Sequence, residues 1–118
     1  MLSPRILIFI TILFAITSPV VAHAILVNST PKANETMTGP AVTLALTFNS
    51  KVDQARSTLS VEKGDRTSCK VPIKVDRSTP EKLTGTVSSL TPGVYKLHWQ
   101  VLAVDGHITR GQFSFEVK

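Results

Sequence analysis

The chain has 118 residues, with 13 lysines and arginines against 8 aspartates and glutamates, and a formal net charge of +5. The basic residues are scattered along the sequence rather than clustered, which argues against a nucleic-acid-binding surface. The single cysteine, Cys69, cannot form an internal disulfide. If the protein is exported to an oxidising compartment, its fold must therefore be stabilised by its hydrophobic core.

The first 22 residues have the pattern of a secretory signal peptide. Arg5 precedes an apolar run over residues 6–16, and the small-residue sequence Val20-Val21-Ala22 supplies a cleavage site. An uncleaved membrane anchor is the alternative, but the apolar run is short for a span and Ser18-Pro19 interrupts it. We therefore expect residues 1–22 to be removed and residues 23–118 to form one soluble domain in the periplasm or outside the cell.

Cleavage after Ala22 makes His23 the first residue of the mature protein. A free N-terminal histidine offers a metal two nitrogen atoms, the α-amine and the ring Nδ1, which together close a six-membered chelate ring. Because some residue must follow every cleavage site, this position alone is weak evidence for a metal site.

The mature sequence is dominated by alternating apolar and polar residues, the period of a strand with one buried face. The pattern is clear in residues 42–48, where Val42 and Phe48 bound the run, and a first strand is predicted at residues 25–28. Further strands are predicted around residues 59–61, 71–75, 83–87, 94–104 and 113–117. About seven short strands separated by Gly- and Pro-containing turns predict an all-β fold, an antiparallel sandwich of immunoglobulin-like or related Greek-key type.

The run 94–104 predicts which side chains face the interior. The residues expected on the buried face are Tyr95, Leu97, Trp99, Val101 and Ala103, with Trp99 as a core anchor. His98 falls on the other face and is expected to be a surface residue, with a role as an additional metal ligand as the alternative. Cys69 is interpreted as a small residue beside a strand, the alternatives being a soft Cu(I) ligand or an intermolecular bridge.

Asp105-Gly106-His107 lies between the last two predicted strands, in a loop at one end of the sandwich. Asp-Gly is a common turn pair and needs no metal to explain it, but His107 is not explained by the turn. Gly106 allows a tight bend, so the carboxylate and the imidazole can face one point. Together with His23 they make a nitrogen-rich set with one oxygen, which suits a tetragonal Cu(II) ion, provided that the N-terminus and this loop meet at the same end.

The combination of these motifs resembles the CopC copper-resistance family. The resemblance covers almost all of the mature chain, and its most specific motifs are the His-Ala start at His23-Ala24 and the segment Trp99-Gln100-Val101 through Asp105-Gly106-His107. It implies a periplasmic β-sandwich that binds one Cu(II) ion through the amine and imidazole of His23, Asp105 and His107. It also implies that the protein buffers copper or delivers it to a CopD-type membrane transporter. We expect the protein to be a monomer and a binding protein rather than an enzyme.

Two departures from the family pattern refine this expectation. Some family members bind Cu(I) through a methionine-rich loop, whereas Met37 is the only methionine of the mature chain. The chain therefore resembles the Cu(II)-only branch. Many members also carry an acidic residue after the Phe-containing strand, where this sequence has Asn49-Ser50-Lys51.

Two alternatives remain open at the level of the sequence. An N-terminal histidine brace also occurs in oxidative copper monooxygenases, but those are generally much larger, and Asp105 would fill a position that oxygen chemistry needs open. The other alternative is an immunoglobulin-like interaction module in which His23, Asp105 and His107 bind no metal.

Overall fold

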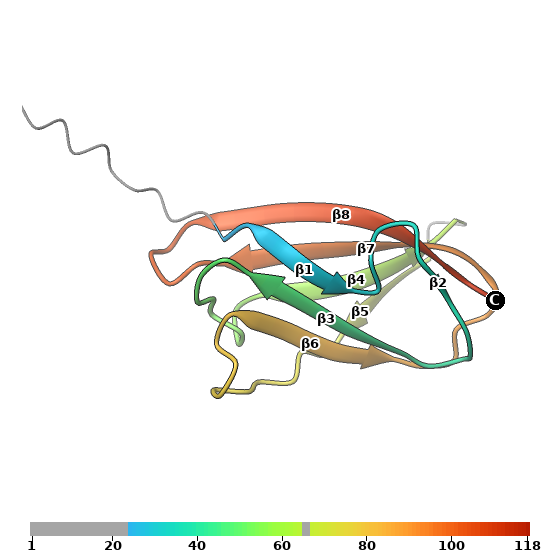
Figure 1. Ribbon diagram of the computed structural model, residues 1–118, viewed down its shortest axis with the longest axis horizontal. Helices are drawn as coiled ribbons and strands as arrows, with labels where there is room; N and C mark the ends of the chain where they lie inside the picture. Colours follow the sequence, from blue (N-terminus) through green and yellow to red (C-terminus); the bar gives the residue numbers. More distant parts are fainter. Residues whose placement is uncertain (1–23, 65–66) are drawn as a thin grey trace, which may run out of the picture.

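The computed structural model describes residues 24–64 and 67–118, which form eight strands in two packed sheets (Figure 1). One sheet has three strands in the order β1-β3-β6: β1 (Leu26–Thr30), β3 (Val42–Phe48) and β6 (Lys82–Val87). The other has the order β2-β8-β7-β4-β5: β2 (Thr36–Met37), β8 (Ile108–Val117), β7 (Gly93–Leu102), β4 (Thr58–Lys63) and β5 (Ser68–Val71). Neighbouring strands are antiparallel, except that β2 pairs with β8 in parallel. The predicted all-β sandwich is confirmed.

Two strand predictions are corrected, and one strand was missed. The two-residue strand β2 was not predicted, because two residues cannot display a period. The strand predicted over 71–75 is instead β5, which ends at Val71 because Pro72 has no N–H group to continue the ladder. Strand β8 begins at Ile108 rather than near residue 113. Its first part was missed because Gly111 interrupts the apolar alternation by which the strand was predicted.

The core fills the space between the two sheets, with alternate residues of each strand facing inward. The inward residues of β3 are almost completely buried, and so are Tyr95, Leu97, Val101 and Ala103 as predicted. Trp99 is only partly buried, and its ring packs against the core over Gly111 and beside Phe113. Trp99 therefore packs against the core as predicted, but its indole lies at the margin of the sandwich rather than at its centre.

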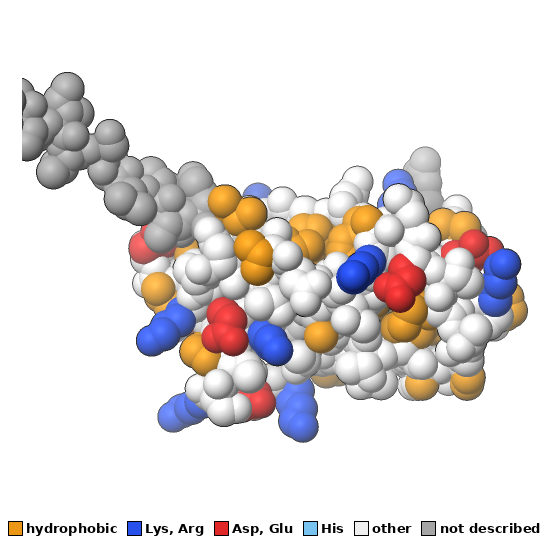
Figure 2. All heavy atoms as spheres, in the orientation of Figure 1, with side chains coloured by type: hydrophobic (Ala, Val, Ile, Leu, Met, Phe, Trp, Pro, Cys, Tyr) orange, Lys and Arg blue, Asp and Glu red, His pale blue; other side chains and the backbone are white. Residues whose placement is uncertain are grey.

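The surface carries both signs of charge. On the face shown in Figure 2, Lys and Arg side chains lie apart from one another and are interspersed with Asp and Glu. The described residues include no helix long and apolar enough to cross a membrane.

Candidate metal-binding site

The loop between β7 and β8 is a tight turn closed by two backbone hydrogen bonds. The Ala103 N–H donates to the His107 carbonyl at 2.8 Å, and the Gly106 N–H donates to the Ala103 carbonyl at 2.9 Å. Gly106 has a φ of 90°, a left-handed conformation that residues with a Cβ rarely adopt. The Asp-Gly pair thus forms the turn expected from the sequence, and the turn brings residues 105 and 107 to one side.

Within this turn, the Asp105 carboxylate contacts His107 twice. The His107 backbone N–H donates to Oδ1 at 3.0 Å, and the His107 ring Nδ1 lies 3.0 Å from Oδ2. The backbone hydrogen bond from His107 is the main reason that the pKa of Asp105 is lowered from 3.8; desolvation opposes it, and the His107 side chain lowers the pKa further. Asp105 is therefore ionised at neutral pH and holds the imidazole beside it.

This contact also determines which ring nitrogen can act as a ligand. A neutral imidazole that donates its Nδ1 proton to the carboxylate carries its lone pair on Nε2. Carboxylate-oriented histidines of this kind are common around metal ions, because the carboxylate fixes the tautomer and the ring orientation. The carboxylate has further lone pairs, so it can orient the ring and still offer an oxygen to a metal.

The connection between β3 and β4, residues 49–57, lies between the start of the domain and this loop. At one side, Asn49 makes two hydrogen bonds with the backbone of Ile25. At the other, Val52 forms a β-bridge with Ala103, and the Asp53 N–H donates to the Leu102 carbonyl at 2.8 Å. In Figure 1, the start of β1 and the β7–β8 loop accordingly lie at the same end of the sandwich.

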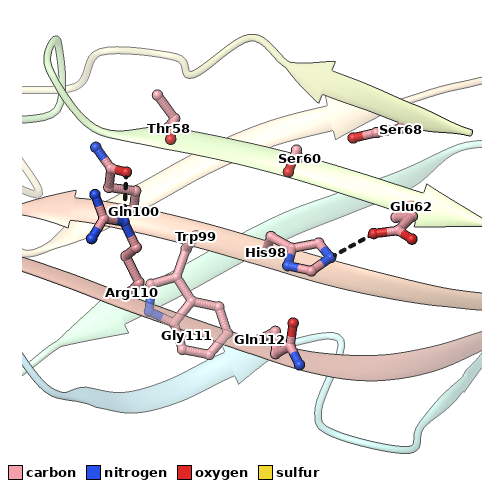
Figure 3. A pocket seen from close by; sticks show the side chains of 10 residues that line it. All are labelled: Thr58, Ser60, Glu62, Ser68, His98, Trp99, Gln100, Arg110, Gly111 and Gln112. Atoms are coloured by element: carbon pink, nitrogen blue, oxygen red, sulfur yellow. Dashed lines mark hydrogen bonds and ion pairs between the residues drawn. The ribbon is translucent and has the colours of Figure 1, made fainter. Parts of the chain in front are cut away.

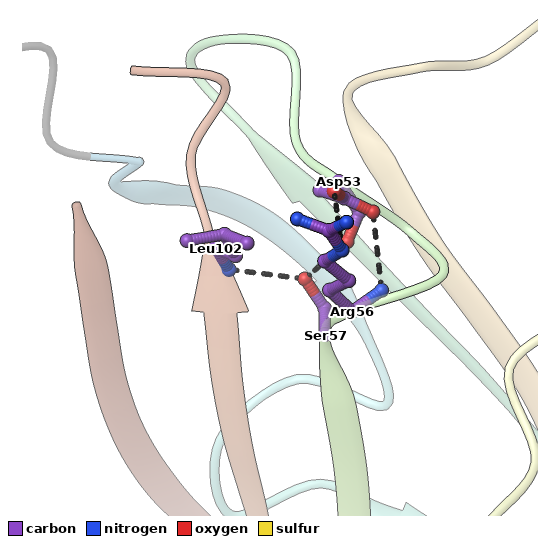
Figure 4. A network of polar contacts seen from close by, with 4 residues as sticks. All are labelled: Asp53, Arg56, Ser57 and Leu102. Atoms are coloured by element: carbon purple, nitrogen blue, oxygen red, sulfur yellow. Dashed lines mark hydrogen bonds and ion pairs between the residues drawn. The ribbon is translucent and has the colours of Figure 1, made fainter. Parts of the chain in front are cut away.

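Ser57 completes this connection (Figure 4). Its hydroxyl donates to the Asp53 carbonyl at 2.7 Å and accepts from the Leu102 N–H at 3.0 Å. The Asp53 side chain in turn accepts the Arg56 N–H at 3.1 Å, so the turn before β4 is internally bonded. The last residue of β7, immediately before the candidate loop, is thereby held from two directions.

The predicted ligand set is only partly within the described residues. Asp105 and His107 are brought together as the sequence predicted, whereas His23 lies outside the described residues, immediately before the fully buried Ala24. The predicted signal peptide, residues 1–22, also lies outside them. Among the described residues, no group of three His, Cys, Asp or Glu side chains could hold a metal, and the predicted set reaches that number only with His23.

His98 lies elsewhere, on the outer face of the five-stranded sheet as predicted (Figure 3). Its Nε2 is 3.1 Å from Oε2 of Glu62 on β4, a partner that the sequence did not reveal because it lies 36 residues away. His98 is four residues from the end of β7, about 13 Å at the usual rise per residue. It is therefore paired with Glu62 in a surface pocket that Trp99 also lines, away from the Asp105–His107 loop.

The two sulfur-containing residues of the mature chain are also remote from this loop. Cys69 is exposed on β5, an edge strand that β4 and β7 separate from β8. Met37 on β2 pairs with Val117, nine residues along β8 from Ile108, or about 30 Å. Neither position adds a sulfur ligand to the candidate site.

Asn49 is the residue of this region whose role sequence reasoning missed. In the sequence it is only the first residue of Asn49-Ser50-Lys51, a stretch where members of the family that the chain resembles often carry an acidic residue. Its contact with Ile25 depends on the pairing of β1 with β3, and no local pattern in the sequence specifies that pairing.

Comparison with known proteins gives a consistent picture. The CopC domain model matches residues 26–118. The chain is 32% identical over 105 residues to protein YobA of Escherichia coli K12, covering 87% of this chain and 85% of that protein. It is 33% identical over 104 residues to copper resistance protein C of Xanthomonas campestris pv. juglandis, covering 82% and 81% of the two chains.

Solved structures show the same sandwich. The crystal structure of CopC from Methylosinus trichosporium OB3b matches with a TM-score of 0.74 and 28% identity, over 81% of this chain and 94% of that chain. PcoC, a methionine-rich copper resistance protein from Escherichia coli, matches with a TM-score of 0.67 over 82% of this chain and all of that chain. Its identity is 22%, so this second likeness concerns the fold alone.

Proposed function

The chain belongs to the CopC family, and from that premise we propose that it is a periplasmic copper-binding protein that holds one Cu(II) ion. The proposed ligands are the α-amine and imidazole of His23, the Asp105 carboxylate and the His107 imidazole. This proposal includes cleavage of the signal peptide after Ala22, because the amine exists as a ligand only when His23 is the first residue.

The contact between Asp105 and His107 is the observation that carries the proposal. A turn can place an aspartate and a histidine near each other without any function, but here the carboxylate both accepts the His107 backbone N–H and faces its ring. The pair therefore presents an ordered nitrogen and oxygen donor set. Three nitrogen atoms and one oxygen form a set that favours Cu(II) over hard cations such as Ca²⁺ and Mg²⁺.

The chemistry of uptake follows from the ligands. An α-amine and an imidazole bind a metal only in their neutral forms, so binding releases protons and weakens as the solution is acidified. Asp105 contributes little to this dependence, because its pKa is lowered and the carboxylate is already ionised at neutral pH.

In the cell, the proposed role is to buffer periplasmic Cu(II) or to deliver it to a CopD-type transporter in the membrane. The relative in Xanthomonas campestris is named for copper resistance, which fits such a role. We propose that the protein acts as a monomer and that it binds copper without catalysing a reaction.

The decisive test is a Cu(II) titration of the protein beginning at His23, followed by electron paramagnetic resonance. The matched control is the same protein with one glycine in front of His23, which keeps every side chain but moves the α-amine to another residue. We expect one tight equivalent with a nitrogen-rich tetragonal spectrum for the first protein, and loss of that tight equivalent in the second. Equal, weak binding by both would instead indicate an interaction module that binds no metal.

A further inference from the structure

We propose that Ala24 and Asn49 form an anchor that positions the mature N-terminus for metal binding. This inference rests on the proposed copper site and adds to it a positioning device outside the ligand set. Its basis is the way in which the first two described residues of the domain are held.

Asn49 bonds both backbone polar groups of Ile25. The Asn49 backbone N–H donates to the Ile25 carbonyl at 2.9 Å, and the Ile25 N–H donates to the Asn49 side-chain Oδ1 at 2.8 Å. Leu26 and Phe48 are the next pair of the β1–β3 ladder, so Ile25 and Asn49 occupy the position where the ladder would continue. One of the two expected ladder bonds is present, and the side-chain amide oxygen replaces the backbone carbonyl in the other.

This replacement allows the chain to turn while the strand end stays bonded. Because Ile25 does not need the Asn49 carbonyl, the backbone can turn away directly after Asn49 and reach the bridge between Val52 and Ala103. Asn49 thus bonds the start of β1 at Ile25, and three residues later the same connection pairs with Ala103 beside the Asp105–His107 loop. A side chain of this length with an acceptor oxygen is what the geometry requires.

Ala24 provides the second part of the anchor. Its exposed fraction is 0%, and it belongs to the hydrophobic core, whereas Ile25 is 57% exposed. Consecutive Cα atoms are about 3.8 Å apart, so residue 23 is one peptide step from a side chain buried in the core. No linker residue therefore separates the proposed amine ligand from the folded domain.

Such an anchor affects affinity through preorganisation. Fixing the backbone of one residue costs enough conformational entropy to change an equilibrium by about tenfold. When the anchor is present, folding of the domain has already met that cost for residues 24 and 25. When it is absent, copper must order these residues as it binds, and its apparent affinity falls.

The test uses the protein beginning at His23 and the variant Asn49→Leu, which keeps a similar side-chain size but has no acceptor for the Ile25 N–H. We expect its Kd for Cu(II) to be weaker by about tenfold or more, with a broadened, heterogeneous electron paramagnetic resonance spectrum. Asn49→Asp keeps the acceptor oxygen, so we expect affinity at least equal to that of the wild type. In the metal-free protein, the Ile25 amide should exchange with solvent slowly in the wild type and rapidly in Asn49→Leu.

Tyr95→Phe is the matched control. It removes a hydroxyl that donates to the Thr91 carbonyl at 2.6 Å and lies 3.4 Å from the Thr91 Oγ1, near the start of β7 and far from the candidate site. We expect unchanged copper affinity and an unchanged spectrum. A general loss of stability would weaken binding in both variants, whereas loss of positioning affects only Asn49→Leu. If Asn49→Leu does not fold, Asn49→Ser, whose hydroxyl is too short to reach, takes its place with the same expectations.

Failure of the anchor is distinguishable from failure of the copper site. If the wild type binds tightly and the folded Asn49→Leu protein binds equally tightly with the same spectrum, the anchor is wrong and the copper site stands. If the wild type binds no better than the form extended by glycine, the copper site is wrong and the anchor has no function to serve.

Discussion

Gly111 shows at the scale of one residue how closely the margin of this sandwich is packed. A Cβ built on Gly111 would lie 2.2 Å from Cζ2 of Trp99, the residue directly opposite it on β7. The indole thus occupies the space that any side chain at position 111 would need. In the sequence, this glycine only interrupts an apolar alternation, whereas in the structure it determines where the single tryptophan lies.

We expect Gly111→Ala to destabilise the protein by about 1–3 kcal/mol, because the methyl group forces Trp99 from its position. Chemical denaturation followed by tryptophan fluorescence measures this directly, and the emission of the folded state should also shift. Gly64→Ala is the control, since a Cβ there would meet no atom within 4 Å. Equal stability of the two variants would show that the indole accommodates a methyl group at no cost.

At the scale of secondary-structure elements, the Gln54 side chain joins two loops that no strand pairing connects, the β3–β4 connection and the segment that leads into β6. Its Nε2 donates to the Thr79 and Lys82 carbonyls, each at 2.8 Å, and its Oε1 accepts the Asp76 N–H at 2.8 Å. The side chain is almost completely buried, at 8% exposed. It fastens the irregular segment before β6 to the β3–β4 connection, which also contacts the candidate site.

Replacing Gln54 with leucine keeps the approximate size of the side chain but leaves three backbone groups without this partner. We expect a loss of roughly 2–3 kcal/mol in the free energy of unfolding, from a net value of about 1 kcal/mol for each hydrogen bond. Urea denaturation provides the measurement. Gln112→Leu, on the exposed outer face of β8, should change stability by less than about 0.5 kcal/mol, and a similar loss there would attribute the effect to glutamine replacement in general.

The sequence predicted those elements whose pattern is local. Strand β3 alternates without interruption, so both its limits and its buried face followed from its residues. Strand β5 was misplaced because Cys69 and its polar neighbours show no alternation, and only pairing with β4 defines them as a strand. A strand of two residues, such as β2, depends wholly on its neighbour β8.

In the candidate site too, local features were predictable and contacts made through strand pairing were not. The proximity of Asp105 and His107 was predictable, because one glycine between them forms the turn. The roles of Asn49 and Glu62 were not, since each contacts a residue more than 20 positions away through strand pairing. His23 lies outside the described residues, so its part in the site stays a prediction.

At the scale of the whole molecule, the proposed site would join the two sheets. The N-terminus leads into β1 of the three-stranded sheet, whereas Asp105 and His107 lie between β7 and β8 of the five-stranded sheet. A metal bound to both would close the sandwich at one end, where the described residues show no strand pairing between β1 and β8. Binding to the folded state alone stabilises a protein by mass action.

We therefore expect Cu(II) to raise the melting temperature of the protein beginning at His23. At a free copper concentration of 100 times Kd, the stabilisation is about 2.7 kcal/mol, several degrees for a domain of this size. Differential scanning calorimetry should show this rise, and the form extended by glycine should show little or none. An equal rise in both forms would place the stabilising ion at some other site.

The burial of Ala24 has a consequence for the order of events during export. Proteases cut chain segments that are exposed and flexible. If cleavage occurs after Ala22, the peptide bond to be cut is two residues before an Ile25 backbone that is hydrogen-bonded on both sides. Once the sandwich has formed, the residues that follow this bond belong to the folded domain, and a protease cannot bind them in an extended conformation. We therefore expect cleavage to come before folding, so that the mature chain has its amine ligand before it acquires the fold that positions it.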